Sequence, residues 1–284
     1  MTTETGPAPS IGKVTLTVHD LQRVSGFYED VIGLHRLGGD GEVARLGVGD
    51  TVLVELRRNA AARRHSPRDA GLFHTAFLLP ARADLGRWLA DAAAKGVALQ
   101  GASDHLVSEA IYLADPEGNG IEVYADRPRG EWRWTNDTVA MSTQPLDKDD
   151  LLRAAGGEPW RGFPEGGIVG HVHLQVGALP QAEAFYADVL GQDVTTHYPG
   201  ATFYSWGGYH HHIATNIWNS RNAQPRTEPA TGLADVEILV PRGDMIEAVR
   251  ARAAEAGLPV EDADAGLRLL DPWRTSLTLR RKAA

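Results

Sequence analysis

IGKVTLTVHDLQRVSGFYEDVIGL at residues 11–34 matches VGHVHLQVGALPQAEAFYADVLGQ at residues 169–192 without a gap. One constant separation along the chain relates Gly12 to Gly170, Phe27 to Phe185, and Gly33 to Gly191. Each copy begins with the alternating residues of a strand and continues with the apolar spacing of an amphipathic helix. A constant separation over this length indicates an internal duplication.

The second part of each copy repeats as well. GLFHTAFLLP at residues 71–80 matches GLADVEILVP at residues 232–241, and both halves go on to an Asp-Pro pair. Each half splits again, because the order strand, helix and three short strands is predicted four times, over residues 11–56, 72–124, 168–217 and 233–281. The sequence therefore predicts an α+β fold of four βαβββ modules, paired into curved sheets that enclose a cavity.

The repeats also suggest how the chain is divided. We expect an N-terminal pair of modules at residues 1–125, a connector at residues 126–167 and a C-terminal pair at residues 168–284. Three tryptophans of the connector would be costly to leave in water, namely Trp132, Trp134 and Trp160. We therefore expect an ordered connector.

The composition excludes several kinds of site and partner. The 284 residues are 43% hydrophobic and 23% charged, as in ordinary globular proteins. The net charge of −9 argues against a nucleic-acid partner. Without cysteine there can be no disulfide, thiolate metal site or cysteine nucleophile, so any metal must be held by His, Asp or Glu. No apolar run is long enough to span a membrane and the first residues lack the features of a secretory signal, so we expect a cytoplasmic protein with no membrane partner.

The repeated modules, the GHVHLQV strand opening and the closing segment DPEGNGIEVY resemble the vicinal oxygen chelate superfamily, which includes glyoxalase I, bleomycin resistance proteins and extradiol dioxygenases. The resemblance covers essentially the whole chain. More narrowly, GASDHLVSEAIYLADPEGNGIEVYADRP at residues 101–128 and GYHHHIATNIWNSR at residues 208–221 resemble the catechol 2,3-dioxygenase-like branch. The resemblance implies the vicinal oxygen chelate fold and a metal-binding oxidoreductase of aromatic compound catabolism.

In that superfamily the metal ligands come from the first and last strands of modules. Here modules two and three carry nearly all the candidates, whereas Thr278 stands in module four where module two has Glu122. If module two faces module three, one cavity gathers His74, Glu122 and His171, the two-histidine, one-carboxylate set that leaves positions open on Fe(II). His173 shares a strand face with His171 and either could coordinate, although the alignment with the family favours His171. The set differs from that of dioxygenases whose three ligands all lie in the second half of the chain.

Residues 103–122 resemble the extradiol dioxygenase signature, in which a histidine and a tyrosine precede an Asp-Pro turn and the ligand glutamate. The segment departs from that signature at Ser103. The turn should make the strand of Tyr112 antiparallel to that of Glu122, which brings the phenol beside the metal. The resemblance assigns His105 and Tyr112 to hydrogen bonds with the substrate oxygens.

The resemblance also requires a histidine as acid–base catalyst near the O2 site, and it comes from the last strand of the module that faces Glu122. That strand contains three consecutive histidines, at residues 210–212. His210 and His212 share a face by strand alternation, so we expect one of them to point inward while His211 points away, and we favour His212.

The resulting hypothesis is Fe(II)-dependent extradiol cleavage of a catechol-type aromatic diol by O2, with Mn(II), Zn(II) or Ni(II) as other candidate metals. Two alternatives stay open: a glyoxalase-type or other metal-dependent enzyme with His212 as a fourth ligand, or a small-molecule binding protein of the bleomycin-resistance kind. The expected partners are the diol and O2, and the sequence is compatible with a homo-oligomer.

Overall fold

The computed structural model describes residues 7–263 and 266–282, and its elements follow the predicted modules. Module one consists of β1 (Ser10–Val18), α1 (Leu21–Phe27) with the π-helical turn η1 (Tyr28–Ile32), β2 (His35–Gly39), β3 (Val43–Val48) and β4 (Thr51–Arg58). Module two consists of β5 (Gly71–Leu78), α2 (Arg82–Ala94), β6 (Gly101–Asp104), β7 (Ser108–Ala114) and β8 (Gly120–Asp126).

The second half of the chain has the same order of elements. Module three consists of β12 (Ile168–Gln175), α4 (Leu179–Glu183) with the π-helical turn η3 (Ala184–Val189), β13 (Asp193–Tyr198), β14 (Ala201–Ser205) and β15 (Ile213–Asn216). Module four consists of β16 (Gly232–Val240), α5 (Gly243–Glu255), β17 (Val260–Ala263), β18 (Gly266–Leu270) and β19 (Ser276–Arg281). The prediction of four βαβββ modules is therefore confirmed.

The repeated glycines mark the same structural point in both halves. Gly33 follows η1 with a φ of 84°, and Gly191 lies two residues after η3 with a φ of 76°. Only glycine adopts this left-handed conformation without steric cost, so it ends the helical segment and returns the chain to the sheet.

The four modules form two sheets, each built from both halves of the chain. The larger sheet has the order β11-β6-β7-β8-β5-β12-β15-β14-β13, and the smaller has the order β17-β18-β19-β16-β1-β4-β3-β2. Modules two and three join through the antiparallel pair β5–β12, and modules one and four through β1–β16. The prediction that module two pairs with module three is confirmed. The expected boundary at residue 125 lies one residue before the end of β8, and each sheet combines strands from both halves of the chain.

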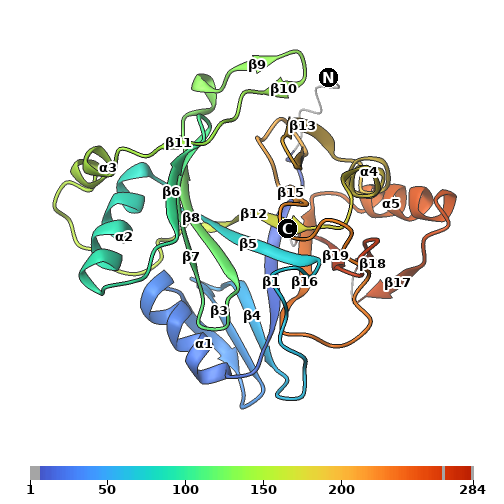
Figure 1. Cartoon of the computed structure of the whole chain (residues 1–284), viewed down its shortest axis with the longest axis horizontal. Helices are drawn as coiled ribbons and strands as arrows, with labels where there is room; N and C mark the ends of the chain where they lie inside the picture. The colour runs from blue at the N-terminus through green and yellow to red at the C-terminus, as the bar shows by residue number, and fades with distance from the viewer. Residues whose placement is uncertain (1–6, 264–265, 283–284) are drawn as a thin grey trace.

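Residues 126–167 form short elements of their own: η2 (Arg129–Glu131), β9 (Trp134–Thr135), β10 (Thr138–Val139), β11 (Gln144–Pro145) and α3 (Lys148–Ala154). The hairpin β9–β10 extends to the top of the molecule in Figure 1, and β11 pairs with β6 at the sheet edge. Trp132 is buried, and Trp134 and Trp160 are partly buried. Through β11 the segment extends the sheet that carries modules two and three.

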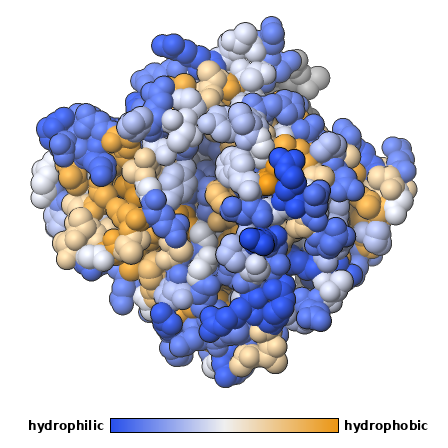
Figure 2. Space-filling view, in the orientation of Figure 1, coloured by the Kyte–Doolittle hydropathy of each residue, from blue (hydrophilic) through white to orange (hydrophobic). Residues whose placement is uncertain are grey.

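The helices lie on the outside of the sheets. In Figure 1, α1, α2 and α3 lie at the left and α4 and α5 at the right, with strands between them. Figure 2 shows apolar side chains gathered at the left of this view, over the region of α2 and α3, on an otherwise largely hydrophilic face. No helix among the described residues is both long and apolar enough to cross a membrane.

Trp88 connects the first two modules. It lies fully buried on the apolar face of α2, and its Nε1 donates a hydrogen bond to the Val31 carbonyl at 2.8 Å. We expect Trp88→Ala to lower the free energy of unfolding by about 3–5 kcal/mol, because it leaves a cavity and removes the donor. Urea unfolding measures the loss. Arg87→Ala, in the same helix, is the control and should cost less than about 1 kcal/mol, and equal losses in both variants would contradict the expectation.

Candidate metal centre and its cavity

Three neighbouring strands of the larger sheet bring His74, Glu122 and His171 together. His74 lies on β5, Glu122 on β8 and His171 on β12, and β5 is the middle strand. The register aligns Ala76 of β5 with both Glu122 and His171, while His74 lies two residues earlier on the same strand face. Because Ala76 has a small side chain, the three larger ones can meet above it.

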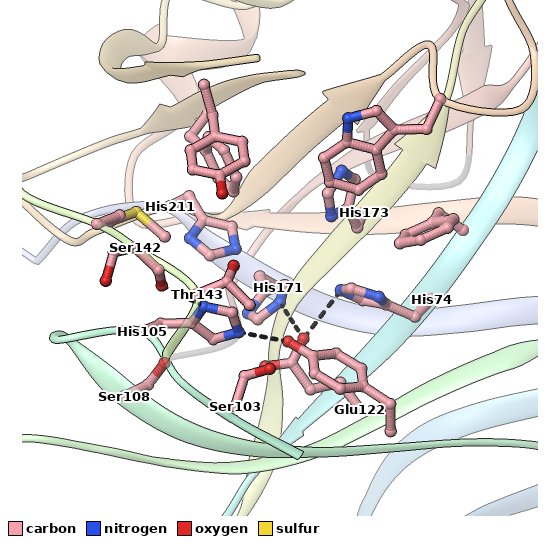
Figure 3. A pocket seen from close by; sticks show the side chains of 16 residues that line it. His74, Ser103, His105, Ser108, Glu122, Ser142, Thr143, His171, His173 and His211 are labelled. Carbon is pink, nitrogen blue, oxygen red and sulfur yellow. Dashed lines mark hydrogen bonds and ion pairs between the residues drawn. The ribbon is translucent and has the colours of Figure 1, made fainter. Parts of the chain in front are cut away.

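The three side chains converge on one point. Glu122 Oε2 lies 2.9 Å from His74 Nε2 and 3.2 Å from His171 Nε2, as the dashed lines in Figure 3 show. The three ligand atoms lie within 4.8 Å of one another, and all three residues are buried. Among the described residues, they form the one group of three His, Asp or Glu side chains close enough to hold a metal ion.

The electrostatics of this cluster fit a cation. Burial opposes ionisation of Glu122, but its ion pairs with His171 and His74 and its hydrogen bond with His171 outweigh it and hold the pKa of the carboxyl well below its usual range. Burial also lowers the pKa of His171 to about 4, which favours the neutral imidazole that binds metals. Nε2 of His74 has no hydrogen-bond partner among the described residues despite its closeness to Glu122. A buried carboxylate facing such an imidazole nitrogen is the donor set that a divalent metal satisfies.

His173 lies outside the cluster. It pairs with His74 across the two strands, but its ring contacts Phe73, Phe203 and Trp218. Its Nε2 is buried without a hydrogen-bond partner among the described residues. Of the two histidines that the sequence left open, His171 is the one beside Glu122.

Tyr112 and His105 lie on the other side of Glu122 from β5 and β12, because β7 borders β8 on that side. Tyr112 on β7 is the direct antiparallel neighbour of Glu122 on β8, as the Asp-Pro turn predicted. Nδ1 of His105 donates to the Ser142 carbonyl at 2.8 Å, so its Nε2 accepts from the Tyr112 hydroxyl at 2.6 Å. Burial, and next the charge of Glu122, raise the pKa of Tyr112 well above its usual value, so its hydroxyl remains a hydrogen-bond donor.

The expectation that His210 or His212 points into the cavity is wrong. His211 lines the cavity and its ring lies 4.0 Å from that of His171, whereas His210 and His212 are not among the lining residues. His212 Nδ1 accepts hydrogen bonds from Ser205 Oγ at 3.0 Å and from the Trp206 amide at 3.3 Å. The physical reason is a bend at residues 209–212, ahead of β15, which breaks the alternation of a strand.

The cavity has a volume of about 250 Å³, and Figure 3 shows the cluster at its base. Its other lining residues are Phe73, Ser103, His105, Ser108, Tyr112, Met141, Ser142, Thr143, His173, Tyr198, Phe203, His211 and Trp218. None of the described residues that line it is Lys or Arg. Met141, Ser142 and Thr143 come from the connector. No signal in the sequence indicated that the connector contributes to the cavity.

The smaller sheet holds no equivalent cluster among the described residues. Asp235 stands in module four where His74 stands in module two, and it accepts hydrogen bonds from Ser276 and Thr278. Glu55, a buried carboxylate that the sequence did not single out, forms ion pairs with Lys13, Arg45 and Arg57. Its partners are basic side chains, so burial here needs no metal.

Comparisons with known proteins agree with this architecture. The family model "Glyoxalase/Bleomycin resistance protein/Dioxygenase superfamily" matches residues 10–123 and 168–264. The chain is 43% identical to catechol-2,3-dioxygenase of Bacillus subtilis over 267 residues, which cover 92% of this chain and 93% of that protein. It is 26% identical to biphenyl-2,3-diol 1,2-dioxygenase 3 of Rhodococcus globerulus over 159 residues, 51% of this chain and 83% of that protein.

Solved structures share the fold at lower identity. Glyoxalase I of Zea mays superposes with a TM-score of 0.59 at 17% identity, over 96% of this chain and 92% of that one. The cppA protein of Streptococcus pneumoniae gives a TM-score of 0.60 at 10% identity, over 96% and 99%. With two sheets of paired βαβββ modules and the sequence match along almost its whole length, the chain belongs to the glyoxalase/bleomycin resistance/dioxygenase superfamily and, within it, to the catechol 2,3-dioxygenase-like branch of enzymes.

Proposed function

We propose that this protein is an extradiol dioxygenase that cleaves the ring of a catechol-type diol with O2, at an Fe(II) ion held by His74, Glu122 and His171. The observation that carries the proposal is the convergence of these three side chains at the base of one cavity. Bound there, Fe(II) would supply open coordination positions for the two diol oxygens and for O2.

The cavity walls suit an uncharged aromatic ring. Phe73 and Phe203 contact the ring of His173 on one side of the cluster, and Met141 approaches Phe203 from the connector. Such side chains bind a flat apolar ring and exclude water from it. Because none of the described lining residues is Lys or Arg, the cavity favours a catechol with neutral substituents over one with a carboxylate.

The polar residues divide into two groups around the metal ligands. The Tyr112 hydroxyl, which here donates its single proton to His105, would turn that proton to an ionised diol oxygen, while Ser142 keeps His105 in place beside it. We assign His211 to accept the diol proton and return it during ring opening, since His211 lines the cavity next to β15, on the other side of the cluster from Tyr112 on β7. This replaces the assignment to His210 or His212.

The glyoxalase-type alternative calls for a fourth protein ligand, and His212 was the candidate. Among the described residues the metal-binding group has three members, and His212 is hydrogen-bonded to Ser205 outside the cavity. Three protein ligands leave room for a bidentate diol and O2 together. The cluster also argues against a binding protein without a metal, since burying a carboxylate together with two histidines is costly without a cation.

The test is O2 uptake by protein loaded with Fe(II) under anaerobic conditions and then mixed with catechol and its alkyl- and aryl-substituted forms. We expect one O2 consumed per ring and a yellow semialdehyde-type product. Protein loaded with Zn(II) or Ni(II) and given the hemithioacetal of methylglyoxal and glutathione is the parallel assay for the alternative. No O2 uptake by fully loaded protein across the panel would contradict the proposal, and isomerisation of the hemithioacetal would favour the alternative.

A further inference from the structure

Behind the cavity, three residues form a chain of hydrogen bonds that leads to the surface. Nδ1 of His211 lies 2.7 Å from Nδ1 of His210, and Nε2 of His210 lies 2.9 Å from Asp126 Oδ1. His211 lines the cavity, His210 is fully buried, and Asp126 lines a separate surface cavity with 23% of its side chain exposed.

The donors and acceptors of these hydrogen bonds can be assigned by starting from Asp126. A carboxylate oxygen only accepts, so Asp126 requires a proton on Nε2 of His210. A neutral His210 then has a lone pair on Nδ1, which requires a proton on Nδ1 of His211. A neutral His211 with its proton on Nδ1 has a lone pair on Nε2, and no described residue makes a hydrogen bond with that nitrogen.

We infer that Asp126 and His210 are positioning residues that hold His211 in the tautomer whose Nε2 faces the cavity as a proton acceptor. Carboxylate–histidine pairs orient catalytic imidazoles by the same logic elsewhere. Here the carboxylate acts through a second imidazole. The meaning of this tautomer for catalysis rests on the proposed function, whereas the tautomer itself does not.

The surroundings of His210 keep this series of hydrogen bonds in place. The ring of Tyr209 stacks on His210 with centroids 4.0 Å apart, and the ring of Trp132 lies at 5.1 Å. The Tyr209 hydroxyl donates to the same oxygen of Asp126 at 3.3 Å. Asp126 is thus fixed by two donors, and His210 can meet it in one orientation.

The experiment reads the tautomer directly. We would record two-bond ¹H–¹⁵N correlation spectra of the full-length chain loaded with diamagnetic Zn(II), and identify the His211 signals by their loss in His211→Gln. We expect neutral His211 to carry its proton on Nδ1. His105, whose Nδ1 donates to a carbonyl, should show the same tautomer and serves as an internal reference.

Asp126→Leu removes the acceptor and should increase the share of His211 with its proton on Nε2, while His105 stays unchanged. Glu131→Leu is the matched control, because Glu131 lines the same surface cavity and contacts neither histidine. Asp126→Glu should restore the original tautomer. In ring-cleavage assays Asp126→Leu should lower kcat about tenfold or more with little change in KM. This loss is smaller than the whole contribution of acid–base catalysis, which is ~10²–10⁴, because His211 itself is still present.

Two outcomes would overturn the inference. One is a wild-type His211 with its proton on Nε2, which would mean that a charged His210 donates in the opposite direction. The other is an unchanged His211 tautomer in folded Asp126→Leu protein. The wild-type spectrum decides the first even if the variant does not fold, and both are read without ring cleavage.

Discussion

Glu122→Ala should lose both the bound metal and ring cleavage. Glu122 is the one carboxylate of the cluster and contacts both of its histidines, at 2.9 Å and 3.2 Å. Two neutral imidazoles bind a divalent cation far more weakly than a set with a charged oxygen. Since changes around metal ligands already cost about 10–100-fold in affinity or activity, the loss of the ligand should exceed about 100-fold in turnover.

Metal analysis after anaerobic loading with Fe(II) measures the effect. The wild-type chain should retain about one ion per chain, and the variant almost none. Glu55→Gln is the matched control, because Glu55 is equally buried at 3% exposure but lies in the smaller sheet among basic side chains. Unchanged occupancy in Glu122→Ala would remove Glu122 from the site.

His211→Ala should lower kcat by roughly 10²–10⁴ while the metal remains bound, as expected when a general acid–base group is removed. His211 lines the cavity beside His171 but is not a member of the three-residue cluster. The variant should therefore separate proton transfer from metal binding.

The neighbouring histidine provides the control for that prediction. His212 lies outside the cavity, and burial lowers its pKa to about 3, so it is a neutral acceptor for Ser205 and Trp206. His212→Ala should leave turnover per metal-loaded chain close to that of the wild type. If His212→Ala lost turnover and His211→Ala kept it, the roles of the two residues would be reversed.

The sequence could predict the fold from its repeated pattern, and the convergent cluster from that pattern together with the resemblance to the superfamily. The repeat between residues 11–34 and 169–192 indicated the modules, and the uneven distribution of histidines indicated that module two pairs with module three. The resemblance indicated which strands carry the ligands, and strand alternation was compatible with His74, Glu122 and His171 facing one cavity. These properties depend on the spacing of residues along regular strands.

The parts that could not be predicted lie where the strands end. The bend at residues 209–212 turns His211 inward against the parity of β15, and its geometry depends on tertiary contacts such as that of His212 with Ser205. Met141 and Thr143 reach the cavity from the irregular connector, whose path has no periodicity to read.

Aromatic content alone does not identify the cavity wall either. Tyr204, Trp206 and Trp218 are all close in sequence to the three histidines and could each have contacted an aromatic substrate. Tyr204 and Trp206 belong to the hydrophobic core, whereas Trp218 lines the cavity. The difference arises from the packing of the sheet against its helices, which residue type does not encode.

The most direct test of the central claim is anomalous diffraction from crystals of the full chain loaded anaerobically with Fe(II). The account predicts one iron peak per chain, within coordination distance of His74 Nε2, His171 Nε2 and a Glu122 oxygen, at the base of the cavity between modules two and three. An iron peak beside Asp235 and Thr278 in the smaller sheet, or no peak at the predicted position in fully loaded protein, would contradict it.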